Sequence, residues 1–432
     1  MSTQHCLRAG AGRAVIDVAG VLPVEGFTSV QNDLHARVLL LESNVRIAIV
    51  SLEITQIPDS IRLRMQECVC RVCQVEPEHV WITTTHSFAG PHLFEAPKPG
   101  ESPRPGQKTR SEEEIKKGNL LCDHYTAALE EACRRAMEST QDAVAGCATG
   151  VSDVVANRNI ETSEGWWLGT NSALPCDKTA SVLRIDSADG KPLAALFVFG
   201  IRSGVMYKVH GEDGGSLVSS DLCGAACTCL EEEFGENFTA MFLCGAACDQ
   251  EPLLKGVCNE LSRDGSLVEK KFDAKTASAI LKAQSARLGC DVLNIWRNAS
   301  QMNDISEIKT GRTLCVCATK ASGETAKLKP ARSLTFEASG EVKQTVSALV
   351  IGNFILAGFQ PEMGGVTSSQ IRQAFPEATA AMAIMVNGAG KCLPDESAYT
   401  ACMYQSQNTP FMPGSAEKLR DTAIALLNEL RK

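Results

Sequence analysis

The 432-residue sequence predicts an α/β protein in which a largely mixed β-sheet is flanked by layers of helices. Short aliphatic runs alternate with segments of helical periodicity over most of the chain. A hydrophobic content of 44% is sufficient to bury a sizeable core. No Pro/Ser-rich linker or long low-complexity stretch divides the chain. We therefore expect a single domain over residues 1–432.

The predicted strands are short runs of β-branched or aliphatic residues. They lie at residues 36–41, 46–52, 80–84, 181–185, 194–199, 240–243, 348–351 and 354–357. Ser43-Asn44 and Gly352-Asn353 each separate two neighbouring runs, which predicts a hairpin at both places.

The predicted helices have apolar residues that share one helical face. They cover residues 58–74, 125–137, a segment beginning near Ser220, 267–288 and 414–430. The first helix contains Cys68, Cys70 and Cys73. Because a helix directs Cys68 to the buried face and Cys70 elsewhere, we favour core packing over a shared metal ion. Residues 95–117 are rich in proline, glycine and charge, which predicts an exposed loop before the second helix.

Charge and cysteine content narrow the possible function classes. The formal net charge is −9 and basic residues form no stripe, so a nucleic-acid partner is not expected. No apolar run reaches the length of a membrane span or of a signal peptide, so we expect a cytoplasmic protein without a transmembrane segment. The nineteen cysteines are an odd number, and we expect them to be mostly reduced thiols.

Three potential metal ligands stand near the ends of predicted strands. His86 follows the strand at 80–84, Glu362 follows the strand at 354–357, and the strand at 194–199 leads the chain toward His210. A strand end is a rigid mount that is open to solvent. Two imidazoles and a carboxylate are the ligand types of a catalytic zinc with an open position. For a single histidine at such a place, a hydrogen-bonded structural role is the alternative.

Five separated segments carry a pattern that is typical of one enzyme family. They are residues 85–91, residues 157–159, His210 together with residues 217–221, residues 244–252 and residues 360–362. In this order they resemble segments of the catalytic domain of the neutral/alkaline non-lysosomal ceramidases, zinc amidases that cleave an N-acyl sphingosine into a fatty acid and a free amine. The resemblance extends from near residue 10 to the C-terminus, and the order and spread of the five segments argue against a chance match.

The resemblance implies a neutral-ceramidase-like fold with a zinc ion bound by His86, His210 and Glu362. It also implies active-site roles for Arg158, which would anchor a polar or anionic group of the substrate, and for Tyr404. A zinc-bound hydroxide would attack the carbonyl carbon of the amide, and the zinc and the Tyr404 phenol would stabilise the oxyanion. The expected substrate is a small-molecule or lipid-like amide.

Three features depart from the pattern of the family. Phe88 stands where the family has a second histidine, so we expect another proton donor, with His92 as the candidate. Cys392 occupies the position of a zinc-contacting tyrosine, and a fourth zinc ligand and a free structural thiol are both open interpretations. We also expect no additional sandwich domain of the kind that typical ceramidases carry after the C-terminal helix.

Three alternatives to a ceramidase-like amidase stay open. In the first, the zinc site cleaves a small non-lipid substrate or another type of bond. In the second, the chain is a binding or scaffold member of the family without turnover. The third is a cysteine hydrolase with Cys392 as the nucleophile, which the sequence disfavours because no histidine lies near Cys392 in the chain.

Overall fold

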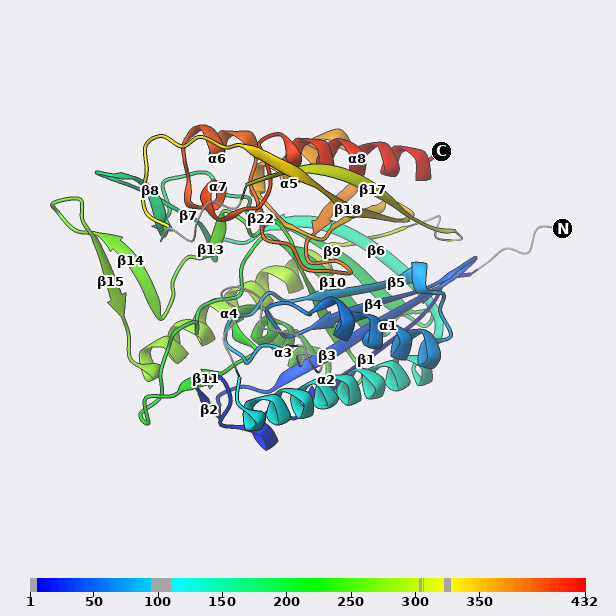
Figure 1. Cartoon of the computed structure of the whole chain (residues 1–432). Coiled ribbons are helices and arrows are strands. Elements are labelled where there is room, and N and C mark those ends of the chain that lie inside the picture. The colour runs from blue at the N-terminus through cyan, green and yellow to red at the C-terminus, as the bar shows by residue number, and fades with distance from the viewer. Residues whose placement is uncertain (1–5, 95–109, 303–304, 306, 322–327) are drawn as a thin grey trace.

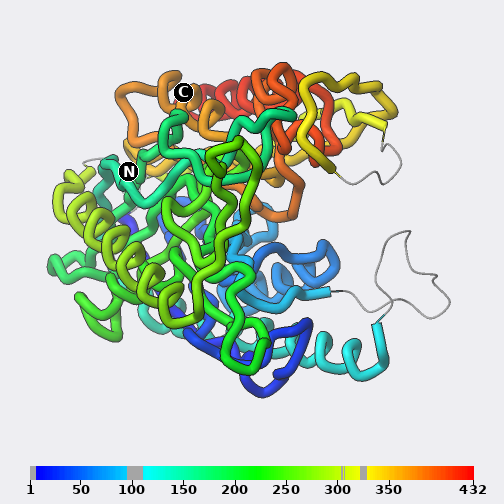
Figure 2. The backbone as a smooth tube through the Cα atoms, turned by 90° about the vertical axis from the view of Figure 1, so that its left-hand side faces the viewer, coloured from blue at the N-terminus to red at the C-terminus, as the bar shows by residue number. Residues whose placement is uncertain are grey.

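Two β-sheets pack face to face between two layers of helices in the computed structural model, which describes residues 6–94, 110–302, 305, 307–321 and 328–432 (Figure 1). In the view turned by 90°, the orange and red C-terminal third again lies above the blue and cyan N-terminal elements (Figure 2). The predicted α/β class and the helical layers on the outer faces are confirmed. The second sheet was not expected from the sequence.

The larger sheet has nine strands in the described part of the chain and contains both parallel and antiparallel pairs. Its order is β12-β10-β9-β6-β1-β3-β4-β5, with β16 paired to β6. The bounds are β1 Arg8–Ile16, β3 Leu34–Glu42, β4 Arg46–Leu52, β5 Val80–Thr84, β6 Gln141–Val151, β9 Thr179–Ser187, β10 Pro192–Phe199, β12 Thr239–Cys244 and β16 Ser300–Gln301. Only β4–β5 and β10–β12 are parallel pairs among these strands, so the sheet is mixed, as predicted.

The smaller sheet has the order β17-β18-β19-β21 and is built around the second predicted hairpin. Its strands are β17 Ile308–Lys320, β18 Ala338–Ile351, β19 Phe354–Phe359 and β21 Thr379–Ala383. Both predicted hairpins are confirmed, since β3 pairs with β4 and β18 pairs with β19 in antiparallel register.

Short strand pairs lie outside the two large sheets. They comprise β2 Phe27–Val30 with β11 Ser216–Val218, β7 Val155–Thr162 with β8 Gly165–Asn171 and β13 Gln250–Pro252, β14 Val257–Leu261 with β15 Leu267–Lys271, and β20 Glu362–Met363 with β22 Cys392–Leu393. The last pair is parallel and sets Glu362 directly beside Cys392.

The helices form the outer layers. The larger sheet is covered by α1 Asp59–Cys73, α2 Glu112–Glu138, α3 Asp221–Phe234 and α4 Ala274–Arg297. The smaller sheet is covered by α5 Gly365–Ala374 and α8 Ser415–Leu430. The short elements are η1 Ala19–Val21, η2 Pro77–His79, α6 Glu396–Thr400 and α7 Tyr404–Asn408.

The layered packing explains why the strands are apolar on both faces. Along β3, Val38 and Leu40 pack against α1 and α2, while Leu39 and Leu41 pack against the smaller sheet. Successive side chains of a strand point to opposite faces, and here both faces are covered. The continuous aliphatic run that predicted this strand is therefore the pattern of a sheet buried on two sides.

Two predicted boundaries were wrong. The helix predicted over 267–288 begins only at Ala274, after Asp273 accepts a hydrogen bond from the Thr276 N–H as the N-cap, and the residues before it form β15. Residues 95–109 of the predicted loop lie outside the described residues, but Glu112–Glu138 is helical from its first residue. A capping box between Ser111 and Glu114 starts this helix, and proline and charge content did not reveal it.

The cysteines behave as the sequence predicted. All nineteen are unpaired, and Cys68 and Cys73 are buried on α1 while Cys70 is only partly buried. Among the described residues, no helix is both long and apolar enough to cross a bilayer. The expected cytoplasmic location and the single-domain organisation stay predictions.

A buried ion cluster joins the N-terminal part of the larger sheet to α3. The guanidinium of Arg37 on β3 donates to both carboxylate oxygens of Glu231 on α3, at 2.9 and 3.1 Å, and also to Glu53. Burial favours neutral carboxyl groups, but Arg37 and His35 lower the pKa of Glu53 below its usual value. Glu231 also accepts from the Ala240 N–H of β12 at 3.2 Å. The cluster therefore connects β3, α3 and β12.

Replacement of Arg37 should destabilise the fold strongly. We expect Arg37→Met to lower the free energy of unfolding by about 3–5 kcal/mol, because two buried carboxylates would lose the buried cation that they share. Urea denaturation followed by circular dichroism measures this change. Arg8→Met is the matched control, since Arg8 is exposed and pairs with Glu42 at 3.4 Å, and it should change stability by less than about 1 kcal/mol. Equal losses in the two variants would contradict a stabilising role for the cluster.

Candidate functional site

The candidate site forms where several strands end on the same side of the two sheets. His86 follows β5, Arg202 follows β10, Cys248 follows β12 and Glu362 follows β19. Each of these strands belongs to a parallel pair, and the carboxyl ends of parallel strands are a common location for ligand sites. The hydroxyl of Ser51 on β4 donates to the Phe242 carbonyl of β12 at 2.7 Å, which holds the β4–β5 edge against β12.

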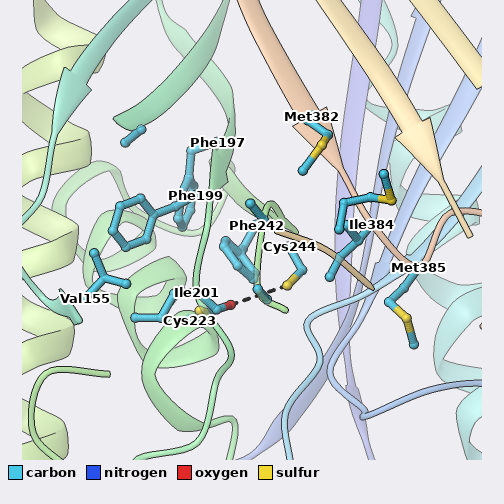
Figure 3. Packing of buried hydrophobic residues seen from close by; sticks show 14 of the residues in the cluster. Val155, Phe197, Phe199, Ile201, Cys223, Phe242, Cys244, Met382, Ile384 and Met385 are labelled. Atoms are coloured by element: carbon cyan, nitrogen blue, oxygen red, sulfur yellow. Dashed lines mark hydrogen bonds between the residues drawn. The ribbon is translucent and has the colours of Figure 1, made fainter. Parts of the chain in front are cut away.

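Buried apolar residues pack beneath the strand ends that carry the site residues. The thiol of Cys244, at the end of β12, donates to the carbonyl of Ile201, just after β10, at 3.3 Å (Figure 3). Phe199, Phe242 and Ile384 pack in the same hydrophobic cluster. The two strand ends are thus held together at the residue before Arg202.

His86 is buried and has an uncommon backbone conformation. Its φ of 55° lies in the left-handed region, which a non-glycine residue adopts rarely and often at functional sites. Nδ1 lies 3.0 Å from the carbonyl oxygen of Thr55, so Nδ1 carries the proton of that hydrogen bond. Nε2 lies 3.1 Å from Oε1 of Glu362, but without hydrogen-bond alignment, and it has no hydrogen-bond partner among the described residues. The ring therefore presents a buried polar atom to the site.

Glu362 carries the negative charge of the site. Burial would raise the pKa of its carboxyl group, but His86, Arg202 and Arg158 outweigh that effect and hold the pKa well below its usual value. The group is therefore an ionised carboxylate at neutral pH. Oε2 lies 3.4 Å from the thiol of Cys392, which sits opposite Glu362 in the β20–β22 pair.

Arg158 lies on β7 and is almost completely buried, with 2% of its surface exposed. Its Nε donates to the Cys248 carbonyl at 2.7 Å, and one terminal nitrogen donates to the Cys392 sulfur at 3.1 Å. Burial would lower the pKa of the guanidinium, but Cys392 and Glu362 raise it above its ordinary value. The predicted placement of Arg158 in the site is consistent with these contacts.

Arg202 is a site residue that the sequence analysis missed. Its guanidinium carbon lies 3.8 Å from the ring centroid of Phe88, which itself contacts His86 edge to face at 4.8 Å. Burial and the nearby Arg158 lower the pKa of Arg202. Its position was the available signal, because Arg202 comes three residues after the predicted strand 194–199 and His86 comes two residues after its own strand.

The chain is similar to two solved ceramidase structures. The neutral ceramidase from Pseudomonas aeruginosa superposes with a TM-score of 0.70 over 99% of this chain and 75% of that protein, at 16% sequence identity. The chain has the neutral-ceramidase fold. A structure described as ceramidase complexed with C2 gives the same TM-score and identity and is covered to 76%. No protein-family model and no curated protein matches the sequence.

Tyr404, at the start of α7, lies near the site residues Arg158, Arg202 and Cys392. Its ring packs at right angles to Trp167 with centroids 5.1 Å apart. Burial raises the pKa of the phenol, while Arg158 and Arg202 lower it and Cys392 raises it, so these groups share one electrostatic environment.

Two predicted site residues lie apart from the cluster. His210 is exposed, and its backbone forms a bridge to Ser216 beside β11. His92 is on the surface, where Nδ1 lies 3.0 Å from Glu25, which also accepts from Arg110 at 2.8 Å. Within the described ranges, neither histidine contacts His86, Glu362 or Cys392. Their spacing in sequence did not show that the loops carrying them turn toward solvent.

The described residues do not fit a three-ligand zinc site. No group of three or more histidine, cysteine, aspartate or glutamate residues among them is arranged to hold a metal ion. His86 Nε2 and the Glu362 carboxylate supply two suitable donors. The guanidinium groups of Arg158 and Arg202, however, place positive charge close to Glu362. The predicted set of His86, His210, Glu362 and Cys392 is thus brought together only in part, and zinc binding stays a prediction.

Two buried aspartates hold the backbone around the site of the ceramidase-like fold. Asp221 accepts from the N–H groups of Val205, Met206 and Leu222 at 2.6–3.0 Å. Asp249 accepts from the Gly365 N–H at the start of α5, at 2.9 Å. Both carboxyl groups thus satisfy backbone N–H groups of neighbouring segments.

Asp249 should make stability depend on pH. Burial raises the pKa of its carboxyl group from 3.8 to about 6, although the Gly365 N–H opposes the shift. The folded state therefore favours the protonated carboxyl group. This preference stabilises the folded protein fully below pH 3.8. The stabilisation is lost as the pH rises from 3.8 to about 6. Asp249→Asn lacks this titration, so wild type should lose about 1–3 kcal/mol relative to the variant across that window. Urea denaturation from pH 4 to 7.5 tests this, and parallel pH profiles would contradict it.

Proposed function

We propose that the chain is a hydrolase that cleaves the carbon–nitrogen bond of an amide. The observation that carries the proposal is the convergence of His86, Arg158, Glu362 and Cys392, from four distant segments, into one buried cluster on a ceramidase-like fold. Buried charged groups at strand ends are costly for stability and are typical of active sites. The buried Nε2 of His86 faces the same cluster, 3.1 Å from the Glu362 carboxylate.

The residues of the cluster have complementary roles in this proposal. Arg158 provides positive charge where the carbonyl oxygen of an amide becomes negative in the transition state. Tyr404, near Arg158, is a second donor for this oxygen. His86 and Glu362 provide the atoms that bind and orient the attacking group at the carbonyl carbon. The finer prediction from the family resemblance is that this group is held by zinc.

A thiol nucleophile is a second candidate chemistry, and the contacts of Cys392 favour it. Its sulfur lies 3.1 Å from a guanidinium nitrogen of Arg158 and 3.4 Å from a carboxylate oxygen of Glu362. A guanidinium stabilises a thiolate. Glu362 is a weak base, because its carboxyl pKa is held well below its usual value, so the thiol proton would pass to water. The thiolate would then form a thioester with the acyl group while the amine leaves with a proton, and water would hydrolyse the thioester. Cys392 thus has charged partners in the structure although no histidine lies near it in the sequence.

Amide hydrolysis should depend on the cluster and not on His92. We expect the purified protein to release free amine from N-acyl amines, and an acyl-chain series will define the substrate size. His86→Ala and Glu362→Gln should lower kcat/KM by about 100-fold or more, as is usual for groups that act on the reacting atoms. His92→Ala should have little effect, because His92 pairs with Glu25 on the surface. A folded wild-type protein without any amidase activity would support the binding or scaffold alternative.

Metal content and thiol chemistry should separate the two candidate mechanisms. After zinc loading and gel filtration, the zinc mechanism predicts one metal per wild-type chain and loss of metal in His86→Ala and Glu362→Ala, measured by elemental analysis. The thiol mechanism predicts full activity in the metal-depleted protein and complete loss in Cys392→Ser. Cys290→Ser is the matched control, since Cys290 is an exposed thiol on α4. Metal retention in His210→Ala would show that His210 is not a ligand.

A further inference from the structure

A small pocket with basic side chains opens beside the cluster. Its volume is about 130 Å³, and its lining includes Phe88, Arg158, Arg202, Tyr207, Lys208 and Lys255. Glu251 and Glu269 are its acidic lining residues. The pocket is smaller than the roughly 300 Å³ or more that drug-sized ligands usually occupy. It is suited to a polar head group and not to a long hydrocarbon chain.

Arg202 is a partly buried cation of this pocket, whereas Lys208 is exposed to solvent. Arg158 donates to Cys248 and Cys392, and Lys255 forms an ion pair with Glu251 at 2.6 Å. Arg202 forms no hydrogen bond or ion pair with any residue that the structure describes. A half-buried guanidinium with unused donors is unfavourable unless an anion or water pairs with it. Its donors are therefore available to a ligand.

Phe88 and Tyr207 set the orientation of Arg202. The guanidinium stacks on the Phe88 ring at 3.8 Å, and Tyr207 contacts the same ring edge to face at 5.5 Å. Such stacking fixes the plane of the guanidinium while leaving its edge free to donate in parallel. Phe88, which replaces a histidine of the ceramidase pattern, thus supports a cation at this place.

We propose that Arg202 binds a carboxylate of the substrate, so that the hydrolase acts on small amides that carry a carboxylate, such as N-acyl amino acids. This inference rests on the proposed amidase function. The planar fork of an arginine matches a carboxylate with two parallel hydrogen bonds. A single negative charge is favoured over a doubly charged phosphate, because Glu251, Glu269 and the ionised Glu362 already lie in or beside the pocket.

The specificity for carboxylates should depend on Arg202. Each N-acyl amino acid is compared with its C-terminal amide, which differs only in charge. Arg202→Met should lower the ratio of kcat/KM for the acid over the amide by about 10- to 100-fold, the usual contribution of a charge-assisted hydrogen bond. Arg202→Lys should lower it less, because it keeps the charge without the fork. Arg134→Gln, an exposed residue on α2, is the control and should leave the ratio as in wild type. An unchanged ratio in Arg202→Met would overturn the proposal.

A binding measurement separates this inference from the amidase proposal. We expect acetate and an N-acetyl amino acid to raise the melting temperature of wild type, and this shift to be lost in Arg202→Met and reduced in Phe88→Leu. Inorganic phosphate should give a smaller shift than acetate. If the protein bound acetate through Arg202 but had no amidase activity, the hydrolase proposal would be wrong and the carboxylate-site proposal would stand. Stabilisation by phosphate alone, or by acetate equally in wild type and Arg202→Met, would overturn the carboxylate assignment.

Discussion

The buried pairing of Arg37 with Glu53 and Glu231 is the interaction on which the rest of the structure depends. It connects β3, the segment after β4 and helix α3, which belong to different parts of the larger sheet and its helical layer. Charged groups in a protein interior require this mutual compensation, since each one alone would be strongly destabilising. The cluster keeps β12 against the β4–β5 edge, and so determines where the chain leaves these strands to form the site.

A second balance of buried charge exists inside the site. The carboxylate of Glu362 faces His86 on one side and the guanidinium groups of Arg158 and Arg202 on the other. Two cationic side chains therefore lie beside Glu362, one of the residues that the family resemblance implies as a metal ligand. The ceramidase fold is therefore retained around a site whose electrostatic character differs from that implied by the sequence motifs. Phe88 and Cys392, the two departures noted in the sequence, both contact this set of charges through Arg202 and Arg158.

The site could be predicted from sequence to the extent that its residues follow strands. His86 and Glu362 come after buried apolar runs and meet in the structure, and Arg158 and Cys392 join them. His210 lies eleven residues beyond the end of β10, in a loop whose course no local pattern reveals. Arg202 lies three residues beyond the end of β10, but an arginine between an isoleucine and a serine has no motif that singles it out.

The sequence by itself determined the strands and most helices, because side-chain periodicity and turn residues act over a few neighbouring positions. The ceramidase-like fold was implied by the resemblance of separated segments to that family, and the structural similarity bears it out. It also determined that the cysteines are largely buried, unpaired thiols. Only the tertiary structure decided that two sheets pack together, which charges compensate one another and which histidine reaches the carboxylate. These features depend on contacts between residues that are far apart in the chain, such as Ser51 with Phe242 or His86 with Glu362, and local patterns carry no information about such distances.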